Sequence, residues 1–216
     1  MMKKTLAAGL PGLHLELPEE RIDTLVAFGR AMVKQSEVMN LTGITDDKGV
    51  ANLHLLDSLT VLSTADLAGK SLIDVGCGAG FPGVPLAIAC PDAKITLLDS
   101  LGKRMKWLEE VLPTLGVSAE CVTARAEEAV VTRRESYDFA TSRAVARLNI
   151  LLELTAPYVR VGGAVDGVFL HFFQLKTQLF DGIAALCQLF LGSHTLHGQH
   201  RAANLNIRGC QFQQDV

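Results

Sequence analysis

The sequence has few aromatic side chains and little net charge of either sign. Among its 216 residues there are one Trp and two Tyr, and 20 basic side chains are set against 23 acidic ones, which leaves a formal net charge of −3. This balance gives no general sign of a nucleic-acid-binding protein, so any contact with RNA or DNA requires a local basic patch. The hydrophobic share of 49% excludes a disordered chain.

Cysteine spacings typical of metal sites, and long apolar runs, are absent too. The five cysteines form no CxxC pair, which argues against zinc and a disulfide framework and favours free thiols in a reducing cytosol. No apolar run approaches the roughly 20 residues that span a bilayer. Pro11 and His14 interrupt the apolar N-terminal stretch, and no cleavage pattern follows it. We therefore expect a cytoplasmic protein without a membrane partner or a bound metal.

Two helices are predicted near the N-terminus. Between Pro18 and residue 39, apolar residues recur at the i, i+3, i+4 and i+7 spacing of an amphipathic helix, and Pro18 suits its start. A second helix is expected over about 48–64, with His54 and Asp57 on one face. Residues 1–64 are thus predicted to form a small helical cap.

From residue 65 the pattern changes to short β-rich segments that alternate with helical ones. The helical segments include 103–115, which Pro113 should end or kink, and 147–159. Gly162 and Gly163 predict a turn into a further strand. Alternation of this kind favours a parallel sheet with crossover helices, a Rossmann-like α/β core over 65–163. The predicted strands are 71–75, 94–99, 119–124 and 137–143.

A glycine-rich segment, IDVGCGAGFPGVPLAIA over 73–89, follows the first predicted strand. Glycine is needed where a chain turns sharply and lets a ligand approach its backbone. The spacing of Gly78 and the next two glycines fits the dinucleotide pattern GxGxxG, which is weak by itself. Asp74 directly before the glycines favours S-adenosylmethionine, because a carboxylate attracts a cationic sulfonium ligand and repels a pyrophosphate. Pro82 suits the first turn of the following helix.

Asp99 ends the second predicted strand. An acid in this position can accept hydrogen bonds from the ribose hydroxyls of either cofactor. It can equally be the N-cap of the helix that follows. Both interpretations stay open here.

Several motifs occur in a characteristic order: NLTGI (40–44), HLLDSL (54–59), DVGCGAGFPGVPLAIA, TLLDSLGKR (96–104), RAEE (125–128) and SRAVA (142–146). Together they resemble the bacterial 16S ribosomal RNA guanine-7 methyltransferases, the glucose-inhibited-division B or RsmG family, over about residues 20–163. The resemblance implies a class I S-adenosylmethionine-dependent methyltransferase fold. It also implies methyl transfer to ring nitrogen 7 of a guanine in the small ribosomal subunit. We expect a monomer with 16S rRNA and not DNA as its partner.

The resemblance also implies which residues contact the cofactor. In addition to Asp74, Gly78 and Asp99, these are Gly76, Phe81, Ala126, Glu127 and Arg143. Two of them have plain structural alternatives: Glu127 as a solvated acid at a helix start, and Phe81 as part of the core.

Arg143 is the candidate catalytic residue, because it ends the fourth predicted strand, where ligands bind in open α/β sheets. It can contact the cofactor carboxylate, an RNA phosphate or the guanine carbonyl; a structural salt bridge is the alternative. If Arg143 serves the transfer site alone, its replacement by Ala should cost only about 1 kcal/mol of stability. His54 and Asp57 can approach the base, cap a helix, or join the cap to the core. The basic residues Lys103, Arg104, Lys106, Arg143 and Arg147 can form a phosphate-contacting patch at the carboxyl face of the sheet; a solvated charged face is the alternative.

Residues after about 164 differ from the rest in composition. Glu153 is the last glutamate, and four of the six histidines lie beyond residue 165. The segment 164–216 is therefore expected to be atypical for the family, out of register with the fold and poorly packed beyond about 173. Two other functions remain open: an NAD-dependent oxidoreductase, and an RNA-binding protein that keeps the fold with impaired catalysis.

Overall fold

Among the described residues, 1–168 and 206–207, six parallel strands form one sheet in the computed structural model. Their order across the sheet is β3-β2-β1-β4-β5-β6, so the order reverses between β1 and β4. Ligands of open α/β sheets bind at such a reversal, beyond the carboxyl ends of the strands. The bounds are β1 Ser71–Val75, β2 Lys94–Asp99, β3 Glu120–Thr123, β4 Tyr137–Arg143, β5 Val159–Val168 and β6 Asn206–Ile207.

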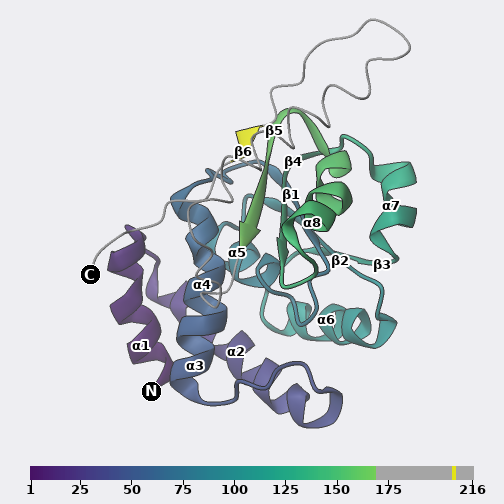
Figure 1. Cartoon of the computed structure of the whole chain (residues 1–216). Helices are drawn as coiled ribbons and strands as arrows, with labels where there is room; N and C mark the ends of the chain where they lie inside the picture. The colour runs from purple at the N-terminus through teal and green to yellow at the C-terminus, as the bar shows by residue number, and fades with distance from the viewer. Residues whose placement is uncertain (169–205, 208–216) are drawn as a thin grey trace, which may run out of the picture.

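Helices cover both faces of the sheet (Figure 1). One face packs against the N-terminal helices, α5 Gly83–Ala89 and α6 Gly102–Thr114 in a core that includes Phe28, Leu72 and Leu97. The other face packs against α7 Ala126–Arg133 and the segment from α8 Leu148–Thr155 to η4 Ala156–Tyr158. Because side chains alternate along a strand, Asp74 and Leu72 point to the same face of β1, the one that the cap covers.

The cap consists of α1 Met2–Gly9, η1 Leu10–Leu13, α2 Glu19–Met39 and a helix that changes character along its length. This last helix, called the cap helix below, runs as α3 Asp47–Val50, the π-helical turn η2 Ala51–Leu56, α4 Asp57–Leu59 and the 3-10 turn η3 Thr60–Ser63. The helix predicted over 48–64 is confirmed, and the helix after Pro18 starts where expected. Helix α1 was not predicted; Met2 and Leu6 on it are buried in the core.

The predicted β1, β2 and β4 match the observed bounds, and α6 ends one residue after Pro113. Two local predictions were wrong. Pro82 is the N-cap of α5 and not part of its first turn. The double glycine lies inside β5: the register with β4 jumps from Val159 to Ala164, and Gly162 has a φ of +85°. The strand therefore begins before the glycines, and the shift in register makes them part of a β-bulge and not of a turn that precedes the strand.

The segment beyond residue 168 lies outside the described residues except for β6, so the expectation of poor packing beyond about 173 cannot be compared with the fold. The two residues of β6 pair in parallel with β5. In the part of the chain that the structure describes, no helix is long and apolar enough to cross a membrane.

Candidate functional site

The glycine loop joins β1 to α5 at the carboxyl edge of the sheet. Its first turn is fixed by N–H groups of Gly76 and Cys77, which donate to the carbonyl of Leu98 at 2.7 and 3.0 Å. Gly76 and Gly78 have φ angles of +74° and +56°, in the left-handed region that glycine tolerates. Among the described residues, a Cβ at Gly78 would meet only the Arg104 guanidinium, at 3.8 Å. The backbone of Gly78 is thus open to a ligand.

Asp74 is fully buried beneath this loop. Its Oδ2 accepts a hydrogen bond from the Gly83 N–H at 2.8 Å, which ties β1 to the start of α5. Its Oδ1 and the hydroxyl of Thr141, its neighbour in register on β4, are the fully buried side-chain oxygens among the described residues that make no hydrogen bond. Burial raises the pKa of Asp74 to about 7, although Gly83 and Arg143 oppose the shift. The carboxyl group thus has one oxygen left for a donor at the carboxyl edge.

We expect Asp74→Asn to change the pH dependence of stability. Because the pKa of Asp74 is raised in the folded state, the folded protein holds a proton that the unfolded chain releases above about 4. Asp74 thus makes stability fall as the pH rises from about 4 to 7. The amide keeps an acceptor for Gly83 and does not titrate, so the variant should gain about 3 kcal/mol relative to the parent across this window.

Urea denaturation at intervals between pH 4.5 and 7.5 measures this difference. Asp92→Asn, at an exposed turn before β2, is the matched control and should leave the pH dependence unchanged. A constant difference between parent and Asp74→Asn would contradict the raised pKa.

Asp99 joins the glycine loop to the segment after β2. Its Oδ2 accepts from the Gly78 N–H at 2.9 Å, and its Oδ1 accepts from the Leu101 N–H at 2.8 Å. The N-cap residue of α6 is Leu101, so the interpretation of Asp99 as the N-cap was wrong by two residues. Since each carboxylate oxygen accepts more than one hydrogen bond, Asp99 can still accept from ribose hydroxyls.

Ala126 and Glu127 begin α7, beside the carboxyl end of β3. The side chain of Glu127 is exposed, as expected of an acid at a helix start. The Ala126 carbonyl accepts a hydrogen bond from the Tyr158 hydroxyl at 2.6 Å. The first N–H groups of a helix have no partner within it, so the backbone of this pair can recognise a ligand edge.

Arg143 ends β4 as predicted, but its side chain points into the cap and is only 9% exposed. Its Nη1 lies 3.3 Å from Asp57 Oδ2 and donates to the Leu53 carbonyl at 3.2 Å. Its guanidinium lies 5.0 Å from the centre of the Phe81 ring. The salt bridge left open as an alternative is therefore present. Because its side chain is buried and paired, we expect Arg143→Ala to cost more than the about 1 kcal/mol that applies to exposed side chains.

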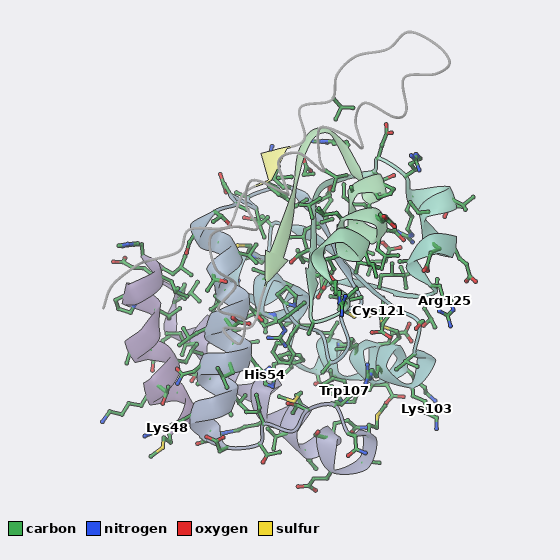
Figure 2. The ribbon with its side chains drawn as sticks, in the orientation of Figure 1. Lys48, His54, Lys103, Trp107, Cys121 and Arg125 are labelled. Atoms are coloured by element: carbon green, nitrogen blue, oxygen red, sulfur yellow. The ribbon has the colours of Figure 1, made fainter. Side chains whose placement is uncertain are left out.

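Phe81 and His54 complete the contact between cap and loop. Phe81 is 3% exposed, and its ring packs against Phe28 at 5.2 Å and His54 at 5.0 Å. The core interpretation of its side chain is thus confirmed. His54, shown on the cap helix in Figure 2, bonds to Thr42 and Arg143. His54 and Asp57 therefore join the cap to the core, one of the three roles considered for them.

Thr42 and the Leu53 carbonyl were not predicted as parts of this cluster. Thr42 lies in the NLTGI motif, which contributed to the family resemblance but gave no sign of a contact with His54. Backbone carbonyls give no signal in a sequence at all. Only the fold brings both to the end of β4.

A pocket of about 810 Å³ lies beside the Asp99–Leu101 segment, between the end of α2 and the start of α6. Lys103, Arg104 and Lys106 line it together with Trp107, and Figure 2 shows Lys103 and Trp107 on α6. The predicted basic patch is thus partly formed: three of its five members line one pocket, whereas Arg143 is buried against the cap.

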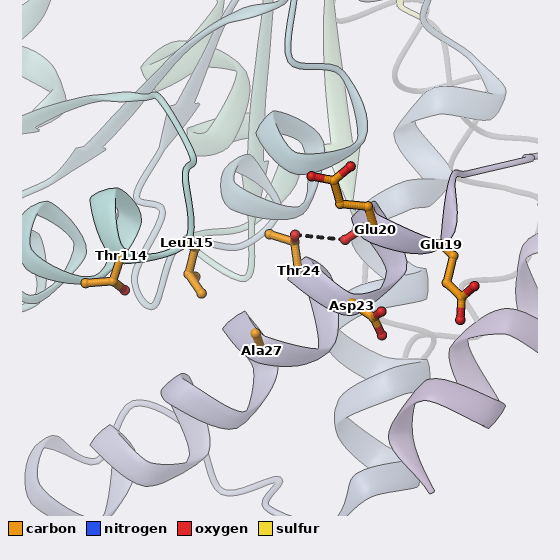
Figure 3. A pocket seen from close by; sticks show the side chains of 7 residues that line it. All are labelled: Glu19, Glu20, Asp23, Thr24, Ala27, Thr114 and Leu115. Atoms are coloured by element: carbon orange, nitrogen blue, oxygen red, sulfur yellow. Dashed lines mark hydrogen bonds between the residues drawn. The ribbon is translucent and has the colours of Figure 1, made fainter.

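Another hollow, of about 610 Å³, lies between the start of α2 and the end of α6 (Figure 3). Its polar lining includes Glu19, Glu20 and Asp23, and the Thr24 hydroxyl donates to the Glu20 carbonyl at 2.9 Å. Lys3 bonds to Glu19 and Asp23. None of the loop residues that surround Gly78 lines this hollow.

The family model described as rRNA small subunit methyltransferase G matches residues 21–171. The chain belongs to this family. Ribosomal RNA small subunit methyltransferase G of Alkaliphilus oremlandii is 43% identical over 75% of this chain and 70% of its own length. The protein of the same name from Leuconostoc citreum is 39% identical over 88% of this chain and 81% of its own.

The family match extends beyond the motifs that suggested it, from 163 to 171, and includes all the predicted cofactor residues. A solved structure described as a predicted O-methyltransferase from Agrobacterium tumefaciens has a TM-score of 0.47 and 21% identity over 62% of this chain and 65% of that one. The oxidoreductase alternative finds no support in the family. Among the described residues, no cluster of three or more His, Cys, Asp or Glu could hold a metal.

Proposed function

We propose that this chain transfers a methyl group from S-adenosylmethionine to ring nitrogen 7 of a guanine in 16S rRNA. The observation that carries the proposal is the glycine loop, open at Gly78 and held between the acids Asp74 and Asp99. It lies within the family match. The methyltransferase family supports the cofactor, and the names of the relatives support the RNA substrate.

The residues at the carboxyl edge fit this cofactor. The unbonded Oδ1 of Asp74 is suited to the cationic methionine end, and Asp99 to the ribose. The N–H groups of Ala126 and Glu127 are suited to the adenine edge. When bound, S-adenosylmethionine supplies a methyl group on a cationic sulfur. The open backbone at Gly78 leaves room for it, so the donor set and the space agree.

The chain's own residues then act by placement. Guanine nitrogen 7 has a lone pair and no proton, so no side chain has to remove one. Holding nucleophile and methyl donor in line can by itself supply several orders of magnitude in rate. Arg143, near Asp74 and fixed against Phe81, is placed to donate to an oxygen of the cofactor or of the guanine.

The decisive experiment is methyl transfer from labelled S-adenosylmethionine to small ribosomal subunits of a strain that lacks the modification. The expected product after digestion is labelled 7-methylguanosine. Label in another nucleoside would contradict the proposed position. Binding of RNA without transfer would support the impaired protein considered above, and calorimetry with NAD binding as tightly as S-adenosylmethionine would support the oxidoreductase.

The basic pocket predicts where RNA phosphates bind. We expect Lys103→Gln with Lys106→Gln to weaken binding to small subunits by about tenfold. The slope of log affinity against log salt should fall by about 1.5, since each lost phosphate contact removes about 0.7–0.9. Filter binding at several salt concentrations measures both.

The matched control is Lys70→Gln with Lys94→Gln, which removes the same charge at the amino edge of the sheet, before β1 and at the start of β2. This pair should leave the slope nearly unchanged. Equal effects of the two pairs would show that only net charge matters and would contradict the assignment of the pocket.

The proposed function is consistent with a particular domain organisation, oligomeric state and cellular location. We infer a helical cap over 1–64, a cofactor-binding core over 65–163 and a monomer that works in the cytoplasm, where its ribosomal substrate is. Gel filtration with light scattering tests the monomer, and a dimer mass would contradict it.

A further inference from the structure

One turn of the cap helix provides three acceptors for the guanidinium of Arg143. The acceptors are the Leu53 carbonyl at 3.2 Å, His54 Nδ1 at 3.2 Å and Asp57 Oδ2 at 3.3 Å. This turn is π-helical: the Asp57 N–H bonds to the carbonyls of Asn52, five residues back, and His54, three residues back, and not to that of Leu53, four residues back. The irregular turn thus presents the Leu53 carbonyl and two side chains to the end of β4.

The bonds determine which ring nitrogen of His54 carries the proton. An arginine side chain has only donors, so Nδ1 of His54 accepts from Arg143 and carries no proton. The proton is then on Nε2, which donates to the Thr42 hydroxyl oxygen at 2.8 Å. The same oxygen accepts from the Ile44 N–H at 3.0 Å. Only a neutral imidazole in this tautomer satisfies every partner.

The plane of the His54 ring is held by stacking against an aromatic side chain. It stacks on Phe81 with 5.0 Å between ring centres and 26° between planes, and Arg143 lies 5.0 Å from the centre of the same Phe81 ring. Phe81 belongs to the glycine loop, so the contact connects the cap, the loop and β4. His54 itself is 8% exposed and lies within a packed boundary.

We propose that His54 is a positioning residue, whose unprotonated Nδ1 fixes the orientation of the Arg143 guanidinium between the cap and the carboxyl end of β4. The inference rests on the proposed function, in which Arg143 contacts the cofactor or the guanine. Thr42 sets the tautomer, and the π-helical turn sets the position of the ring. The polar face of the cap helix thereby acts on the reaction through Arg143.

Protonation of His54 would remove the acceptor and place a second cation beside Arg143. The charged groups around them are Arg143 from β4, Asp57 from the cap helix and Asp74 from β1. Burial, with the charge of Arg143, lowers the pKa of His54 to about 4. The imidazole therefore stays neutral, and the arrangement intact, at the pH of the cytoplasm.

NMR of histidine labelled with ¹⁵N and ¹³C tests the tautomer in the unmodified protein. The resonances of His54 are those that disappear in His54→Asn. At pH 7 we expect them to report a neutral ring with the proton on Nε2. A proton on Nδ1, or on both nitrogens, would overturn the proposal whatever the activity of the enzyme.

Two variants test the effect on the reaction. In His54→Asn the side-chain oxygen can take the place of Nδ1 and still accept from Arg143. In His54→Gln the amide reaches the place of Nε2 and can bond to Thr42, but the acceptor for Arg143 is lost. We expect kcat to fall less than threefold in the first and at least tenfold in the second, with similar melting temperatures.

Equal kcat values in the two variants, or the reverse order, would overturn the positioning role and leave His54 as a structural link to Thr42. No methyl transfer by the unmodified protein would contradict the proposed function instead. The NMR measurement then decides the geometry of His54 by itself, so the two failures are distinguishable.

Discussion

Gly78→Val should abolish measurable binding of S-adenosylmethionine, with a loss of at least about 100-fold, or 2.7 kcal/mol, in affinity. Gly78 has a φ of +56°, and in the described part of the chain the space where a Cβ would lie is open apart from Arg104 at 3.8 Å. A branched side chain would fill the room that a ligand needs and would oppose the left-handed backbone. Calorimetric titration with S-adenosylmethionine measures the loss.

Gly116→Val is the matched control for backbone strain. Gly116 has a φ of +66° in the turn after α6, and no described residue beyond its chain neighbours lies within 4 Å of the position of its Cβ. Like Gly78→Val, this variant should lose about 1–2 kcal/mol of stability from left-handed backbone strain. It should bind the cofactor normally. If both variants bind alike, the loop that contains Gly78 is not the cofactor site.

Arg143→Ala should lower methyl transfer by about 100-fold or more, as the loss of a pre-positioned donor does in other enzymes. It should also cost about 2–3 kcal/mol of stability, because it leaves Asp57, 18% exposed, and its neighbours in the cap without their cation. Arg143→Lys should rescue little, since an ammonium cannot reach three acceptors with the geometry of a planar guanidinium. Single-turnover rates and urea denaturation measure the two effects.

Asp57→Asn separates the structural part of the Arg143 effect from the catalytic part. It removes the negative charge of the Arg143–Asp57 pair and keeps the guanidinium of Arg143. We therefore expect a stability loss similar to that of Arg143→Ala, with most of the transfer rate retained. A double-mutant cycle of the two positions gives the coupling energy in stability. Normal turnover by a folded Arg143→Ala protein would show that the arginine only joins the cap to the core.

Much of the fold could be predicted because local signals and global packing agree in it. The strands β1 and β2 are short, mostly apolar runs between turn residues, and burial on both faces of the sheet requires such runs. Helix α1 was not predicted, because its eight residues are too few for a clear periodic pattern and its stability depends on burying Met2 and Leu6 against the rest of the cap. The bulge at Gly162 depends on the pairing with β4, which no local signal records.

Part of the candidate site could be predicted from the sequence, and part depends on tertiary contacts. The sequence alone determined the family, the glycine loop and the acids that flank it, because a sharp turn beside a ligand restricts which residues can occupy each position. It could not decide between a catalytic and a structural Arg143, since the partners of that side chain lie some 90 residues earlier in the chain. Only the tertiary structure decided that Leu53, His54 and Asp57 meet the guanidinium. The physical reason is that a buried cation must find its acceptors in space, and the packing of the cap on the sheet chooses them.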